Sequence, residues 1–208
     1  MKKKAVVLLS PFLIMAINVV VAILFGRMIG KWAFVPIILI EWCLFVFFIL
    51  RFGGTASIRD WLRPPTGSFG WNILALVVGL IPLPLFLMHF DTLSTGPIVL
   101  SWLLLALINP WIEEFYWRGL LMKYTDQWPR VVSVLFTSLV FAGSHAVFGI
   151  NSALNHGFTV IISTFVMGVV WAVVFLKTGS LRWTIGAHFL VDFLGLSAAA
   201  FLDLWEAP

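Results

Sequence analysis

Apolar residues run along the chain in long blocks, and short polar stretches separate them. Seven blocks can be drawn: residues 5–25, 32–50, 71–90, 97–122, 131–148, 157–176 and 183–203. Each is close to the roughly 20 residues that a helix needs to cross the hydrocarbon layer. Backbone groups in lipid must bond within their own segment, so each block is expected to be helical. The pattern predicts an all-α membrane protein of about seven transmembrane helices, forming a single transmembrane domain over residues 1–208.

Composition supports a membrane protein and excludes the common soluble classes. Hydrophobic residues make up 62% of the chain and charged residues only 11%, whereas soluble domains are about 25% charged. The formal net charge is +4, but the Lys and Arg residues lie between the apolar blocks. Membrane lipid is therefore the expected partner, and nucleic acid is not. The single cysteine, Cys43, excludes an intrachain disulfide and is expected to be a buried apolar residue.

The basic residues indicate an orientation. With the N-terminus in the cytoplasm, the cytoplasmic segments hold ten of them: Lys2, Lys3, Lys4, Arg51, Arg59, Arg63, Lys123, Arg130, Lys177 and Arg182. The outer loops hold only Arg27 and Lys31. Because cytoplasmic loops carry the excess of Lys and Arg, this bias places the N-terminus inside and the C-terminus outside. The polar stretch between Arg51 and Gly70 contains a candidate short interfacial helix near residues 58–63.

Two adjacent carboxylates and a guanidinium lie in the fourth block, where charge is unfavourable. Glu113, Glu114 and Arg118 follow an uncharged run from Pro97 to Ile112. Ionisable groups near a bilayer centre are unfavourable by roughly 2.5–3.5 kcal/mol each, and they usually mark chemistry or transport. Glu114 and Arg118 are four residues apart, so they share a helix face and can pair. Glu113 points about 100° away and is free to face a cavity.

Pro110 lies just upstream of these acids and cannot donate a backbone hydrogen bond, so we expect the helix to kink or loosen there. Two further motifs lie in other blocks: Phe141-x-x-x-His145 and His188-x-x-x-Asp192. Each motif alone fits a structural role. A carboxylate four residues from His188 could also fix the tautomer of its imidazole. Together the motifs predict that the fourth, fifth and seventh helices converge on one polar cavity within the membrane.

These motifs, in this order and spacing, resemble those of the CPBP family, the CAAX-protease and bacteriocin-processing (Abi) intramembrane endopeptidases. The resemblance rests on Pro110-x-x-Glu113-Glu114-x-x-x-Arg118-Gly119, Phe141-x-x-x-His145 and His188-x-x-x-Asp192, and it covers a catalytic core of about residues 97–203. It implies a helical peptidase in a membrane, most often the plasma membrane of a prokaryote. The substrate would be a peptide or protein that is lipidated or carries a transmembrane or C-terminal sorting segment.

The resemblance also implies roles for the residues. Glu113 matches the water-activating base, Glu114 and Arg118 the supporting pair, and His145 and His188 the two histidines. Asp192 stands where CAAX-processing members carry Asn. An ionised Asp cannot donate to an oxyanion, so either Asp192 is protonated or it orients His188, which then donates alone. The cofactor is either none or a divalent metal, with zinc as the candidate and Glu113, His145 and His188 as its ligands.

Other functions are also consistent with intramembrane acids and histidines. The sequence contains no H-E-x-x-H zinc motif, no G-x-S-G turn and no G-x-G-D motif, which argues against three other intramembrane protease classes. A transporter would usually show paired repeats with broken helices, and none is evident. A non-catalytic bacteriocin-immunity or scaffold protein is the main alternative. The basic residues on the cytoplasmic side lead us to expect that the cavity opens toward the cytoplasm.

Overall fold

The computed structural model describes residues 2–93 and 96–205, and these residues form helices and connecting turns without strands. The α-helices are α1 (Lys2–Ile29), α2 (Phe34–Phe48), α3 (Gly54–Trp61), α4 (Phe69–Gly79), α5 (Leu83–His89), α6 (Gly96–Glu114), α7 (Met122–Tyr124), α8 (Arg130–His145), α9 (Phe158–Thr178), α10 (Arg182–Leu194) and α11 (Ser197–Phe201). Short 3-10 helices follow α1, α5 and α8, at Gly30–Ala33, Phe90–Thr92 and Phe148–Ile150. π-helical turns follow α2 and α6, at Ile49–Gly53 and Phe115–Leu121. The predicted all-α architecture is confirmed.

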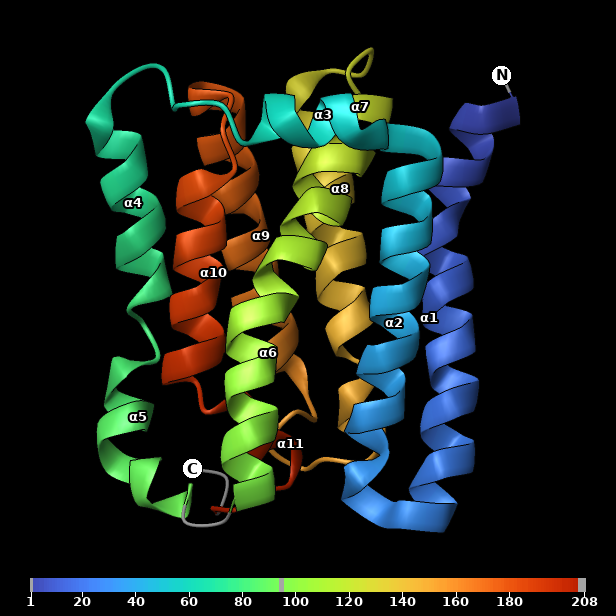
Figure 1. The fold of residues 1–208 in the computed structure, drawn as a ribbon, viewed down its shortest axis with the longest axis vertical. Helices are drawn as coiled ribbons and strands as arrows, with labels where there is room; N and C mark the ends of the chain where they lie inside the picture. Colours follow the sequence, from blue (N-terminus) through green and yellow to red (C-terminus); the bar gives the residue numbers. More distant parts are fainter. Residues whose placement is uncertain (1, 94–95, 206–208) are drawn as a thin grey trace.

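Five helical stretches among the described residues are long and apolar enough to cross a membrane: Lys2–Trp61, Phe69–Thr92, Gly96–Tyr124, Arg130–Ile150 and Phe158–Thr178. The first contains both α1 and α2, which lie side by side and run in opposite directions (Figure 1). The predicted segment 183–203 is not one of the five. The structure thus supports a multi-pass membrane protein, while the count of seven crossings stays a prediction.

Two predicted helices are broken in the structure. Segment 71–90 splits into α4 and α5 because Pro82 lacks the N–H that would continue α4. Segment 183–203 splits into α10 and α11 at Leu196, whose φ of 52° ends the helical path. Cys43 is exposed on the surface of the bundle, so the expectation that it is buried was wrong. Its apolar segment places it on a face that hydrocarbon would cover.

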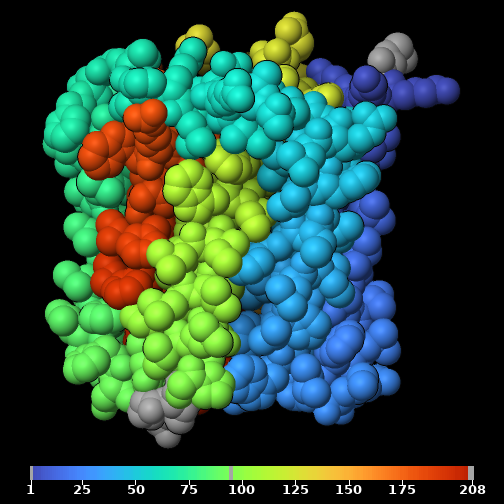
Figure 2. Space-filling view, in the orientation of Figure 1, coloured from blue at the N-terminus to red at the C-terminus, as the bar shows by residue number. Residues whose placement is uncertain are grey.

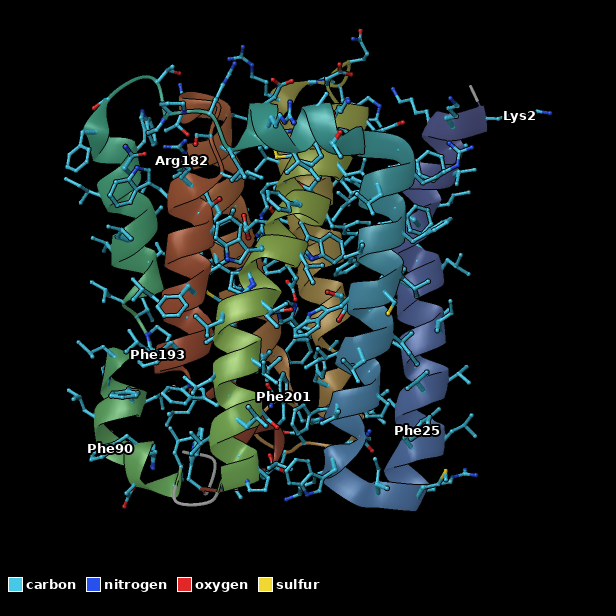
Figure 3. The ribbon with its side chains drawn as sticks, viewed as in Figure 1. Lys2, Phe25, Phe90, Arg182, Phe193 and Phe201 are labelled. Carbon is cyan, nitrogen blue, oxygen red and sulfur yellow. The ribbon has the colours of Figure 1, made fainter. Side chains whose placement is uncertain are left out.

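The connecting segments gather at two opposite ends of the bundle. The start of α1, the short helices α3 and α7, and the start of α10 lie at the upper end in Figure 1, whereas α5 and α11 lie near the lower end. Figure 3 places Lys2 and Arg182 near the upper end and Phe90 near the lower end. The segments that carry the ten basic residues therefore share one end, as the predicted orientation requires.

Helix α6 lies near the middle of the bundle and positions the site. It packs against α2 and α10, and α10 is visible between α4 and α6 on the face shown in Figure 2. The π-helical turn after α6 is buried against α2, where the rings of Phe45 and Tyr116 stack with centroids 4.1 Å apart. Gly119 allows Trp61 of α3 to pack against the same turn, because a Cβ there would lie 2.7 Å from the Trp61 ring.

Candidate active site

A cavity of about 160 Å³ lies between α6, α8, α9 and α10. Four of the predicted site residues line it: Glu113, His145, His188 and Asp192. They come from three helices that the sequence motifs marked separately. The predicted convergence of these helices on one polar cavity is therefore observed.

The two adjacent glutamates face different surroundings. Glu114 and Arg118 are almost completely buried, and Arg118 Nη1 donates to Glu114 Oε1 over 2.7 Å. Glu113 is 6% exposed and faces the cavity, and its Oε2 accepts no hydrogen bond from the described residues. The predicted separation of roles thus has a geometric basis. Glu114 pairs within its helix, while Glu113 presents a carboxylate oxygen to the cavity.

The helix around these acids departs from α-geometry, as Pro110 led us to expect. Pro110 lies inside α6, and the backbone changes to a π-helical turn at Phe115, directly after Glu114. Such turns insert an extra residue into an α-helix and are common at functional sites. The turn buries Arg118 and the large rings of Tyr116 and Trp117.

His188 is held by Glu114 more closely than by Asp192. Its Nδ1 lies 3.1 Å from Glu114 Oε1, whereas its Nε2 lies 3.8 Å from Asp192 Oδ2. The ring also stacks on Trp171, with centroids 4.9 Å apart. A carboxylate oxygen only accepts, so Glu114 requires the proton on Nδ1, and Asp192 faces the other ring nitrogen. Carboxylates flank both ring nitrogens, so both nitrogens can carry a proton.

The backbone of His145's own helix fixes its tautomer. His145 Nδ1 donates to the carbonyl oxygen of Phe141 over 2.9 Å. A carbonyl can only accept, so the neutral ring keeps its lone pair on Nε2. The Phe141 ring packs against this imidazole and also against Arg118, whose Cζ lies 4.1 Å from its centroid. Phe141 thus has two roles: its carbonyl fixes the tautomer of His145, and its ring covers the buried guanidinium of Arg118.

Sequence reasoning missed Asn109 and Trp42. The Asn109 side chain lines the cavity, accepts from Trp42 Nε1 over 2.8 Å and donates to Asp192 Oδ2 over 3.1 Å. Asn109 is four residues before Glu113, so helical spacing could have placed it on the same face. Trp42 gave no such signal, because a tryptophan within an apolar segment is ordinarily expected to pack. Glu41, its neighbour, is only 4% exposed, and a lone acid in an apolar block was a signal that the sequence analysis passed over.

The cavity extends toward the end of the bundle that is opposite the basic segments. Its lower lining includes Asn155 from the α8–α9 connection, together with Ser197, Ala200 and Phe201 from α11. Trp117, Leu120 and Leu121, which follow Glu113 along the chain toward the other end, are buried and do not line the cavity. The lining thus lies toward the end opposite the basic segments, and the expected opening toward the cytoplasm stays a prediction.

The three candidate metal ligands are not grouped closely in the structure. Within residues 2–93 and 96–205, no group of three or more His, Cys, Asp or Glu side chains is arranged to hold a metal ion. Nδ1 of both histidines bonds to protein oxygens, which leaves Nε2 of each ring as the nitrogen without such a bond. Glu113, His145 and His188 share a cavity, and the choice between no cofactor and a divalent metal stays a prediction.

Comparison with known proteins identifies the region that carries the motifs. A family model described as Type II CAAX prenyl endopeptidase Rce1-like matches residues 95–194. No curated protein and no solved structure matches the chain. The matched region contains all three motifs and every predicted site residue, from Glu113 to Asp192. The match over residues 95–194 supports the CAAX-protease (CPBP) family of intramembrane endopeptidases for this chain.

Proposed function

We propose that this protein hydrolyses a peptide bond of a membrane-associated or lipidated peptide or protein, with Glu113 as the base that activates water. The observation that carries the proposal is the position of the Glu113 carboxylate. It faces a cavity shared with two histidines, and its Oε2 has no partner among the described residues. A general base must present a free oxygen to the proton that it removes.

In the proposed reaction, Glu113 takes a proton from water that also contacts His145. The Nε2 of His145 is free to accept because its Nδ1 donates to Phe141. The water oxygen attacks the scissile carbonyl, and His188 donates to the oxyanion that develops. Glu113 then returns the proton to the leaving amine, so no covalent intermediate forms. Loss of one such oxyanion donor typically costs about 2.7–4 kcal/mol in the barrier.

Glu114 and Arg118 support this reaction without contacting the substrate. The Glu114 carboxylate accepts from both Arg118 and His188 through the same oxygen, Oε1. It thereby connects the ion pair of α6 to the oxyanion donor on α10. The guanidinium lies against the rings of Phe141 and Trp171, at 4.1 and 5.3 Å from their centroids. The charges of Glu114 and Arg118 thus compensate each other where water does not reach them, as buried ion pairs require.

Hydrolysis in this scheme needs no metal. The protein is proposed to lie in a plasma membrane with its N-terminus in the cytoplasm. The substrate is a peptide or protein, either lipidated or carrying a transmembrane or C-terminal sorting segment. Metal analysis of purified, active protein tests the first point, since stoichiometric zinc would contradict it. A non-catalytic immunity or scaffold role would need neither histidine. A host phenotype unchanged after replacement of both His145 and His188 would favour that role.

The central test is Glu113→Gln, which keeps the shape of the side chain but removes the base. We expect turnover of an internally quenched farnesylated CAAX peptide to fall by about 100-fold or more, with the thermal stability of the purified protein unchanged. The matched control is Asp91→Asn, the same chemical change at an exposed position outside the cavity. Turnover near that of wild type in Glu113→Gln would refute the scheme. In the native host, a precursor that accumulates in the variant and is identified by mass spectrometry would name the substrate.

A further inference from the structure

Asn109 connects three helices through its side-chain amide. Trp42 of α2 donates to its Oδ1 over 2.8 Å, and its Nδ2 donates to Asp192 Oδ2 of α10 over 3.1 Å. Asn109 itself belongs to α6 and lies one turn before Glu113. The amide therefore sits in the cavity wall between the candidate base and the acid that faces His188.

The orientation of this amide is determined by its neighbours. An indole N–H can only donate, so the oxygen of Asn109 must face Trp42 and its nitrogen must face Asp192. Asp192 then receives a donor on the same oxygen that lies 3.8 Å from His188 Nε2. The side chain of Asp192 is 14% exposed toward the cavity, so its packing alone leaves it room to turn.

We propose that Asn109 is a positioning residue of the peptidase, which holds the Asp192 carboxylate beside His188. Asp192 then keeps a proton on Nε2 of His188, the nitrogen that faces the cavity. The inference rests on the proposed function, because it assigns Asn109 a part in preparing His188 for the oxyanion. Trp42 contributes by preventing the amide from turning over.

Exchanging the two residues separates this role from a purely structural one. In Asn109→Asp/Asp192→Asn, Trp42 can still donate to residue 109, and the new amide on α10 can donate to the new carboxylate on α6. The hydrogen bonds between the helices are thus retained with one direction reversed, but the carboxylate has moved away from His188. The proposal predicts that the exchange restores stability and does not restore catalysis.

The measurements are thermal unfolding of each purified variant and kcat and KM on the farnesylated CAAX peptide. For Asn109→Leu and for Asp192→Leu we expect kcat to fall at least about tenfold with little change in KM, since carboxylates that orient a histidine contribute that much or more. The double exchange should unfold near the wild-type temperature and keep the reduced kcat. Asn72→Leu, which removes a buried amide from α4 outside the cavity, is the matched control and should turn over normally.

Two outcomes would overturn the positioning role of Asn109, and a third would contradict the proposed function instead. Wild-type kcat in the double exchange would overturn the positioning role, because hydrogen bonding alone would then suffice. Unchanged kcat in Asn109→Leu would overturn it as well. A wild-type protein that cleaves no peptide, while its Asn109 variants still unfold at lower temperature, would contradict the proposed function and leave only a structural role for the amide.

Discussion

Replacing Glu114 by Gln is expected to destabilise the protein strongly, because the carboxylate compensates a guanidinium that water does not reach. Glu114 is 0% exposed and Arg118 is 1% exposed. Removing one partner of a buried ion pair typically costs about 3–5 kcal/mol. The amide oxygen of Gln can still accept one hydrogen bond, so we expect the lower end of this range, about 3 kcal/mol.

A second substitution tests whether the uncompensated charge is the cause. Arg118→Met removes the charge while keeping a long side chain against Phe141 and Trp171. The double variant Glu114→Gln/Arg118→Met should therefore recover most of the lost stability, since apolar replacements of buried ion pairs are often neutral. It should not recover turnover, because His188 still lacks the carboxylate that accepts from its Nδ1.

The assay is unfolding in mixed micelles with increasing SDS, followed by tryptophan fluorescence, together with cleavage of the farnesylated peptide. Asp91→Asn provides the control and should change the free energy of unfolding by less than about 0.5 kcal/mol. If Glu114→Gln unfolds like the wild type, the buried charge is compensated by something other than Glu114. If the double variant is as unstable as the single one, lost packing rather than lost charge explains the effect.

Three further predictions concern other parts of the molecule. Partial burial acts to raise the pKa of Asp203, but hydrogen bonds from the α8–α9 connection and from a lysine lower it to about 2, below its ordinary 3.8. The stability that this carboxylate adds should thus be full above about pH 4 and disappear as pH falls toward 2, and Asp203→Asn should flatten that part of a stability–pH profile. Gly119→Ala should lower the free energy of unfolding by about 1–3 kcal/mol, because its Cβ would lie 2.7 Å from the Trp61 ring; a stability equal to wild type in SDS titration would contradict the close packing. Asn155→Cys, in a Cys43→Ser background, should react with a membrane-impermeant maleimide in intact cells, since this partly exposed residue lines the end of the cavity away from the basic segments; labelling only after the cells are opened would reverse the orientation.

Much of the site could be predicted from sequence because its signals are local. Helical spacing alone pairs Glu114 with Arg118 and turns Glu113 away from them, and the structure has this arrangement. Pro110 likewise predicted a disturbed helix near the acids, and a π-helical turn begins at Phe115, directly after Glu114. The same local reasoning assigned His188 to Asp192, its neighbour at four residues. In the structure a residue from another helix, Glu114, is nearer to the ring.

The sequence by itself determined the apolar helices, the end of the bundle that is basic, and the three motifs that share one cavity. These follow from composition and from periodicity within single segments, which the membrane environment enforces. Only the tertiary structure decided that Glu114 also holds His188, that Asn109 joins α2 to α10, and that the cavity extends away from the basic end. Those contacts join residues 67 to 83 positions apart, and no pattern within one segment specifies which partner a side chain meets across a helix interface.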